Sequence, residues 1–135
     1  MSNNELAGLY LKTRVTIEEH GRLVDAVDAD VVTHGVVHVI TAWNPGDLRP
    51  SEQENLAAND ALKERLVALG LHPIRAIGSD PDSSHFEESW AASGLTDAEA
   101  RTIGADFGQA AVFRLDARSQ TVLGCVGQWE VSRTV

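Results

Sequence analysis

The stretch GVVHVITAWNPGDLRPSEQENLAAND, residues 35–60, decides the fold because it joins a strand to a long helix through one tight break. Its first nine residues are mostly β-branched or aromatic and apolar on both faces, a pattern that predicts a central strand. Asn44-Pro45-Gly46 ends this strand. Ser51 and Glu54 have the spacing of a capping box, so we expect a helix that begins there and runs to Leu69, before Gly70.

The predicted helix carries two asparagines where its apolar stripe is expected. At about 100° per residue, Asn55 and Asn59 fall on the same side as Leu62 and Leu66. These amides therefore face the end of the strand, and a buried amide without partners costs about 1–3 kcal/mol. Two interpretations remain open. The amides hold the Asn-Pro-Gly turn, or they line a polar cleft at the strand end, where open α/β folds place ligands.

The rest of the chain predicts further strands and one more main helix. A helix is expected over 4–12, and Thr96 with Glu99 caps the second main helix, which ends at Gly108. Alternating or apolar segments predict strands at 13–19, 72–78, 110–116 and 121–129. Residues 88–92 are expected to be extended, and 22–27 is either the return strand of a hairpin or the start of a loop. We therefore expect one domain over residues 1–135 with an α+β (α/β-like) fold. It would have a mixed, largely antiparallel sheet of about five to six strands, two main helices, and a loose polar tail from about residue 130.

The composition excludes several classes of function. The chain has 135 residues with 11 basic and 20 acidic side chains, and a net charge of -9 disfavours nucleic acid as a partner. The single cysteine, Cys125, permits no intrachain disulfide, and no basic-then-apolar leader is visible, so we expect a cytoplasmic protein. No apolar run reaches the length of a membrane span. The chain has no Walker A, G-x-S-x-G, G-x-G-x-x-G or C-x-x-C motif, so no cofactor is expected.

Four segments in order resemble the DUF3293 family, bacterial domains of unknown function. They are ITAWNP (40–45), the pair Asn55 and Asn59, EES (87–89) and GADFGQAAVF (104–113). The resemblance runs from about Tyr10 to Phe113, and the T-A-x-N-P, Glu-x-Ser and Phe-before-Gln elements of the family correspond to Thr41, Ala42, Asn44 and Pro45, to Glu87, Glu88 and Ser89, and to Phe107 and Gln109. The family often has a serine soon after the proline, whereas here Gly46-Asp47 intervenes and the first serine is Ser51. The resemblance implies a fold and a site, and it brings no activity.

The candidate ligand-binding residues lie at the break and in the segments that carry the resemblance. They are Trp43, Asn44, Ser51, Asn55, Asn59, Glu88 and Gln109. Pockets rich in amides suit neutral hydrogen-bonding groups such as bases or sugars, so the first hypothesis is a small polar or nucleotide-like ligand.

Two alternatives remain. One is a hydrolase-type enzyme in which Glu88 or His85 is the general base. Glu87 and Glu88 are adjacent in a strand and point to opposite faces, so at most one of them faces a site. The other is a protein-interaction or regulatory module, which requires an exposed apolar patch near Trp90 or Trp129. The five histidines lack metal-ligand spacing, so no metal site is expected.

Overall fold

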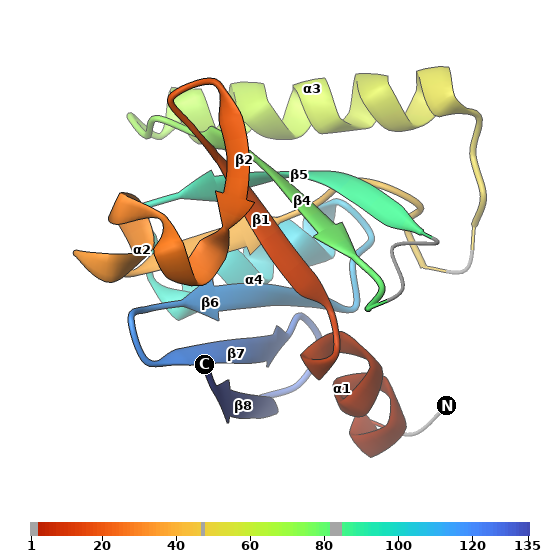
Figure 1. Ribbon diagram of the computed structural model, residues 1–135. Helices are drawn as coiled ribbons and strands as arrows, with labels where there is room; N and C mark the ends of the chain where they lie inside the picture. Colours follow the sequence, from red (N-terminus) through yellow and green to blue (C-terminus); the bar gives the residue numbers. More distant parts are fainter. Residues whose placement is uncertain (1–2, 47, 82–84) are drawn as a thin grey trace.

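The structure is a computed structural model, and it describes residues 3–46, 48–81 and 85–135. Within them the chain forms one curled sheet in the order β2-β1-β4-β5-β3-β6-β7-β8 (Figure 1). The strands are β1 (Arg14–Glu19), β2 (Arg22–Asp25), β3 (Val37–Ile40), β4 (Ile74–Ser79), β5 (Phe86–Ala92), β6 (Ala111–Leu115), β7 (Ser119–Gly124) and β8 (Glu130–Thr134). The helical elements are α1 (Asn3–Leu11), the 3-10 turn η1 (Ala26–Asp28), α2 (Asp30–Thr33), α3 (Glu52–Ala68) and α4 (Asp97–Asp106).

The expected mixed sheet of five to six strands with two main helices is wrong. The described residues form an eight-stranded half-barrel in which every neighbouring pair of strands is antiparallel. The alternation of strands and helices suggested parallel neighbours, because α3 joins β3 to β4 and α4 joins β5 to β6. In the sheet, however, β5 lies between β3 and β4, and β3 lies between β5 and β6. Each helix therefore crosses over one strand, and the strands it connects are not neighbours.

Two short strands account for the larger sheet. Segment 22–27 was a candidate return strand, and β2 pairs with β1 through Ile17↔Val24. The tail expected to be loose from about residue 130 contains β8, which pairs with β7 through Val122↔Val131. The polar composition of β8 follows from its place at the edge of the sheet, where its side chains are mostly exposed.

The two faces of the sheet carry separate apolar cores. Helices α3 and α4 cover one face, with a core of Ile40, Ala42, Leu62, Leu66, Ala92, Ala100, Ile103, Val112 and Leu123. The concave face, toward which the sheet curls, brings β1 and β7 into one core and carries α1, η1 and α2 (Figure 1). That core contains Val15, Ile17, Ala26, Ala29, Val32, Val37, Val39, Ala76, Ala91, Ala111, Phe113, Leu115 and Val122.

The capping boxes predicted for both main helices are confirmed. At α3, the Glu54 N–H donates to Ser51 Oγ and the Ser51 N–H donates to Glu54 Oε1, each at 3.1 Å. At α4, Thr96 and Glu99 make the same reciprocal pair at 2.9 and 3.1 Å. These bonds satisfy backbone donors that the first helical turn otherwise leaves free. None of the helices in the described residues is both long and apolar enough to span a bilayer.

Candidate functional site

Asn55 holds the turn at the end of β3 through a reciprocal pair of hydrogen bonds. The backbone N–H of Asn44 donates to Asn55 Oδ1, and Asn55 Nδ2 donates to Asn44 Oδ1, both at 2.9 Å. Asn44 has a φ of 45°, in the left-handed region that asparagine tolerates better than most residues. Asn55 is 3 % exposed, so its amide is taken up by the turn inside the protein.

Two more amides complete what we call the amide cluster: Asn44, Asn55, Asn59 and Gln109. The Ala42 N–H points to Asn59 Oδ1 at 3.4 Å, and Gln109 Nε2 donates to the Trp43 carbonyl at 3.2 Å. Asn59 and Gln109 are both buried. The cluster thus binds three consecutive residues of the chain that leaves β3, and it joins α3 and the segment after α4 to that point.

The remaining candidate residues have separate partners. Ser51 caps α3, as described above. Glu88 forms a two-pronged ion pair with Arg75 at 2.8 and 2.9 Å. The prediction that Trp43, the amide cluster, Ser51 and Glu88 bind a ligand stays a prediction, and the hydrogen bonds described above for these residues are all internal to the chain.

A pocket opens on the concave face, beside the amide cluster and under α1. We call it the concave pocket. It has a cavity volume of ≈ 70 Å³, and its walls come from α1 and four adjacent strands or their ends: Tyr10, Thr13, Val39, Thr41, Gly78, Ser79, Asp80, His85, Glu87, Ser89, Ala111 and Phe113. Several positions of the pocket wall hold glycine, serine or alanine, whereas the core beside them also contains valine, leucine and isoleucine. These small side chains leave the space unfilled.

Thr41 connects the amide cluster to the concave pocket. Its hydroxyl donates to the Glu88 carbonyl at 2.7 Å and accepts from the Trp43 N–H at 3.0 Å. Both functions of the hydroxyl are used, so Thr41 fixes the pocket wall and ties the end of β3 to β5. The turn that the amide cluster holds therefore also sets the position of one side of the pocket.

Glu87 is the carboxylate that faces the concave pocket. It shares a face of β5 with Ser89 and Ala91, because alternate residues of a strand point the same way. Burial raises the pKa of Glu87 above its usual value, and the opposing effect of the nearby His85 does not cancel that rise. His85 Nε2 lies 3.6 Å from Glu87 Oε2. A carboxyl group in these surroundings is suited to exchange a proton or to bind a donor group.

Tyr10 closes the concave pocket from α1. Its ring packs against Phe113 with centroids 5.9 Å apart and planes inclined by 57°. Burial, reinforced by the charge of Glu87, raises the pKa of Tyr10 to about 12. The phenol therefore stays neutral at physiological pH, and Tyr10 contributes both an aromatic ring and a hydroxyl to the residues that line the cavity.

The pH dependence of stability should identify the Glu87 carboxyl group. Because the pKa of Glu87 is raised, its contribution to stability is complete below about pH 4 and is lost as the pH rises through the folded pKa. In the Glu87→Gln variant this loss is absent. The difference in melting temperature, variant minus wild type, should therefore increase from about pH 4 to about pH 8, and thermal unfolding across that range measures it.

Glu18→Gln is the control for that experiment. Glu18 is a half-buried glutamate on β1, on the face opposite Ile17 and outside the pocket. We expect no comparable rise for this variant. A difference for Glu87→Gln that stays constant with pH would contradict the assignment.

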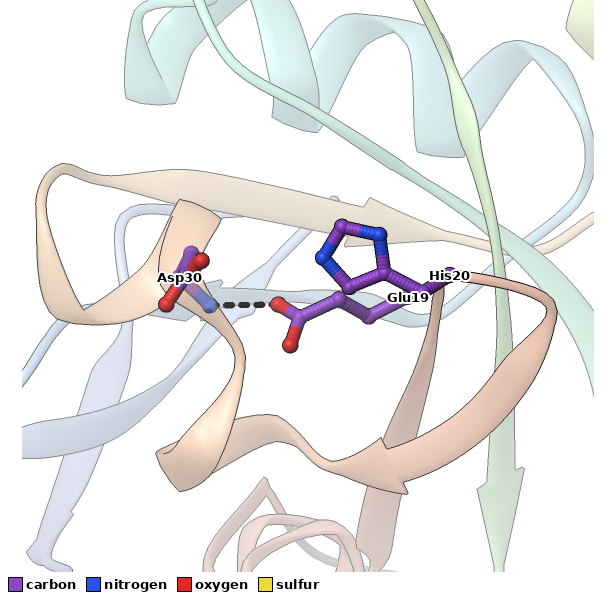
Figure 2. Close-up of side chains that lie close together, drawn as sticks. All are labelled: Glu19, His20 and Asp30. Atoms are coloured by element: carbon purple, nitrogen blue, oxygen red, sulfur yellow. Dashed lines mark hydrogen bonds between the residues drawn. The ribbon is translucent and has the colours of Figure 1, made fainter.

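A second group of titratable side chains lies between the β1–β2 turn and α2. Glu19, His20 and Asp30 bring their potential ligand atoms within 4.8 Å of one another (Figure 2). One carboxylate oxygen of Glu19 accepts the backbone N–H of Asp30 at 2.7 Å, as the dashed line in Figure 2 shows. This bond satisfies a donor at the start of α2, and His20 and Asp30 are exposed. The Glu19 carboxylate therefore has a structural role at the start of α2, and we do not assign these three residues as a metal site.

A third group joins the start of α4 to the sheet. His38, which is 2 % exposed, has its Nε2 2.8 Å from Asp97 Oδ1, and Arg114 pairs with the other oxygen of Asp97. Burial raises the pKa of Asp97, but its bond to His38 and the charge of Arg114 outweigh this, so the pKa is lowered overall. One carboxylate thus connects α4 to β3 and β6.

The two tryptophans considered as interaction sites are both half-buried. Trp90 Nε1 donates to the Asn59 carbonyl at 2.9 Å, and the ammonium of Lys63 lies 4.9 Å from its ring centroid. Trp129 packs against Gly124, where an added Cβ would come within 2.1 Å of the indole nitrogen. Both side chains are therefore engaged within the fold.

The fold and the site define a small, strand-dominated domain, an antiparallel half-barrel sheet with a pocket on its concave face. A family model described as a protein of unknown function (DUF3293) matches residues 40–112. The chain belongs to this family, so the resemblance stated above is confirmed. No curated protein and no solved structure matches the chain.

The matched residues include the whole amide cluster and part of the concave pocket. Thr41, Glu87 and Ser89 lie in the matched segment and line the concave pocket, whereas Tyr10 lies outside it. The sequence analysis considered both glutamates, but it placed Glu88 and not Glu87 among the candidate site residues. The Glu-x-Ser spacing contained the missing signal, since it places Glu87 and Ser89 on the same face as Ala91, which is buried in the concave core.

Proposed function

We propose that this chain binds a small polar molecule in the concave pocket. One observation carries the proposal. Glu87, a carboxyl group 29 % exposed, lies in a cavity on an otherwise apolar face, with His85, Ser89 and Tyr10 beside it. Ligand sites of this kind are concave, largely apolar and equipped with a few convergent polar groups. The amide cluster supports the site by holding the end of β3, which carries Thr41.

A wider cleft leads from this pocket to the surface. It has a volume of ≈ 620 Å³ and shares Tyr10, Thr13, Asp80, His85 and Glu87 with the concave pocket. Its other lining residues are Leu9, Lys12, Arg49 and Pro81. We call it the outer cleft. The two spaces together would enclose the head group of a small ligand and leave its remainder at the surface.

A panel of small polar compounds tests the proposal by thermal shift. The panel should include sugars, nucleosides, amines and carboxylic acids. We expect at least one class to raise the melting temperature of the wild type, because a ligand that binds only the folded state stabilises it. Ser89→Val replaces the hydroxyl in the pocket wall with two methyl groups, and it should remove the ligand-dependent shift while the protein stays folded.

Glu87→Gln provides a second variant should Ser89→Val fold poorly, and Glu18→Gln is the control. Glu87→Gln should weaken the shift for the binding class, and Glu18→Gln should preserve it. The proposal is overturned if no class shifts the wild type. It is also overturned if Ser89→Val and Glu87→Gln respond as the wild type does.

A second candidate function is a hydrolase-type enzyme, favoured by the distance of 3.6 Å between His85 Nε2 and Glu87 Oε2. A carboxyl group with a raised pKa beside an imidazole can act as general acid or base. In this case hydrolysis of simple ester or amide substrates should depend on pH through the titration of Glu87. A loss of about 10²-fold or more in rate is expected for Glu87→Gln. Equal rates for the wild type and the variant would exclude it.

A further inference from the structure

The outer cleft shares the titratable residues of the concave pocket and adds two basic ones. Glu87, Asp80 and His85 line the concave pocket, and among the described residues no lysine or arginine does so. Lys12 and Arg49 line the outer cleft. The concave pocket, the inner end of the site, therefore favours a ligand group that donates hydrogen bonds. The outer cleft, which forms the rim of the site, adds two cationic side chains.

The aromatic residues of the concave pocket favour a cation as that donor. Tyr10 and Phe113 form the tilted pair described above, and both line the cavity. The face of an aromatic ring attracts an ammonium or guanidinium group within about 6 Å of its centroid. A carboxylate and ring faces together recognise an organic cation through charge and through its apolar carbon atoms.

The size of the two spaces limits the length of the ligand. A cavity needs about 10–15 Å³ of this kind of volume to hold one water molecule. The ≈ 70 Å³ of the concave pocket therefore accommodates roughly five non-hydrogen atoms. That is enough for an amino group with a short carbon chain. Leu9 and Pro81 give the outer cleft some apolar wall.

We propose that the site binds a short zwitterion of the amino-acid type, a primary amine that carries a carboxylate at its other end. Its ammonium group contacts Glu87 between Tyr10 and Phe113, and its carboxylate reaches Arg49 or Lys12 at the rim. This assignment rests on the proposed function, because it specifies the ligand of the same pocket.

Calorimetric titration with three probes of the same chain length tests the assignment. The probes are 4-aminobutyrate, butylamine and butyrate, which carry both charges, the cation alone and the anion alone. For the wild type we expect 4-aminobutyrate to bind most tightly, butylamine several-fold more weakly, and butyrate not detectably. A charge-assisted contact in a partly buried site is strong, whereas an exposed ion pair at the rim adds little.

Variants separate the two ends of the ligand. Glu87→Gln should weaken both amine probes by about tenfold or more, because it removes the charge that the ammonium group contacts. Arg49→Gln should weaken 4-aminobutyrate, to the affinity of butylamine or slightly above it if Lys12 still contributes. Because the charge of Arg49 also acts on Glu87, butylamine should bind the variant at least as tightly as it binds the wild type or differ from it by less than 4-aminobutyrate does. Glu18→Gln, outside the site, should leave all three affinities unchanged.

Three outcomes overturn the assignment. The first is butyrate binding as well as butylamine. The second is Glu87→Gln leaving the affinity for the amines unchanged. The third is that none of the three probes binds although another class in the polar panel binds the concave pocket, and this result leaves the proposed function intact. If no polar compound binds at all, the proposed function and the assignment both fail.

Discussion

Asn55→Ala is expected to lower the free energy of unfolding by about 2–3 kcal/mol. The alanine removes the acceptor of the Asn44 N–H and the donor to Asn44 Oδ1, and it leaves the turn without the bonds that hold its left-handed residue. A buried polar group without a partner costs about 1–3 kcal/mol, and a small cavity adds to this. Urea denaturation followed by circular dichroism measures the change.

Two substitutions on α3 serve as comparisons. Gln53→Ala, two residues earlier and exposed, should change stability by less than about 0.5 kcal/mol. Asn59→Ala should have an intermediate effect, because its contact with the Ala42 N–H is longer, at 3.4 Å. Equal effects for Asn55→Ala and Gln53→Ala would show that the turn does not depend on the amide.

Asp97→Ala is expected to cost about 2 kcal/mol at neutral pH. The substitution leaves His38, which is buried, and Arg114 without the carboxylate that both contact. Because the pKa of Asp97 is lowered in the folded state, its contribution is present above about pH 4 and is lost as the pH falls through the folded pKa. The difference between wild type and variant should therefore shrink in acid.

Asp106→Ala is the matched control at the other end of α4. Asp106 pairs with Arg65 at 2.6 Å, and its side chain is 52 % exposed. An ion pair that exposed contributes about 0–1 kcal/mol, so this variant should stay close to the wild type. Thermal unfolding of both variants between about pH 3 and about pH 7 checks the prediction. A constant cost of Asp97→Ala across that range would contradict it.

Much of the local structure was predictable from the sequence because it depends on neighbouring residues. Capping boxes, glycine stops and apolar alternation involve residues a few positions apart, and they located α3, α4 and most strands. The burial of Asn55 and Asn59 followed from helical periodicity alone. The periodicity left open whether these amides hold the turn or line a cleft, and it did not identify their hydrogen-bond partners.

The order of the strands was not predictable in this way, because it depends on pairings between distant segments. Nothing in β3 or α3 indicates that β5 will lie between β3 and β4. The pocket was missed for a related reason. Tyr10, Thr41 and Glu87 come from three distant parts of the chain, and the space between them exists because small residues meet on three different strands. Glu88 was chosen over Glu87 since the sequence does not state which face of β5 is concave.

The crossing of each main helix over one strand has a consequence for how the protein folds. In the part of the chain that the structure describes, strand β3 pairs with β5 and β6 alone, and both follow it by more than a whole helix. During synthesis β3 and its turn are complete while both of their neighbours are still missing. The middle of the sheet therefore forms late, through contacts between distant residues that slow folding. Until β6 has emerged, β3 keeps an open edge that other chains can pair with, and a fragment ending before Ala111 should aggregate for this reason.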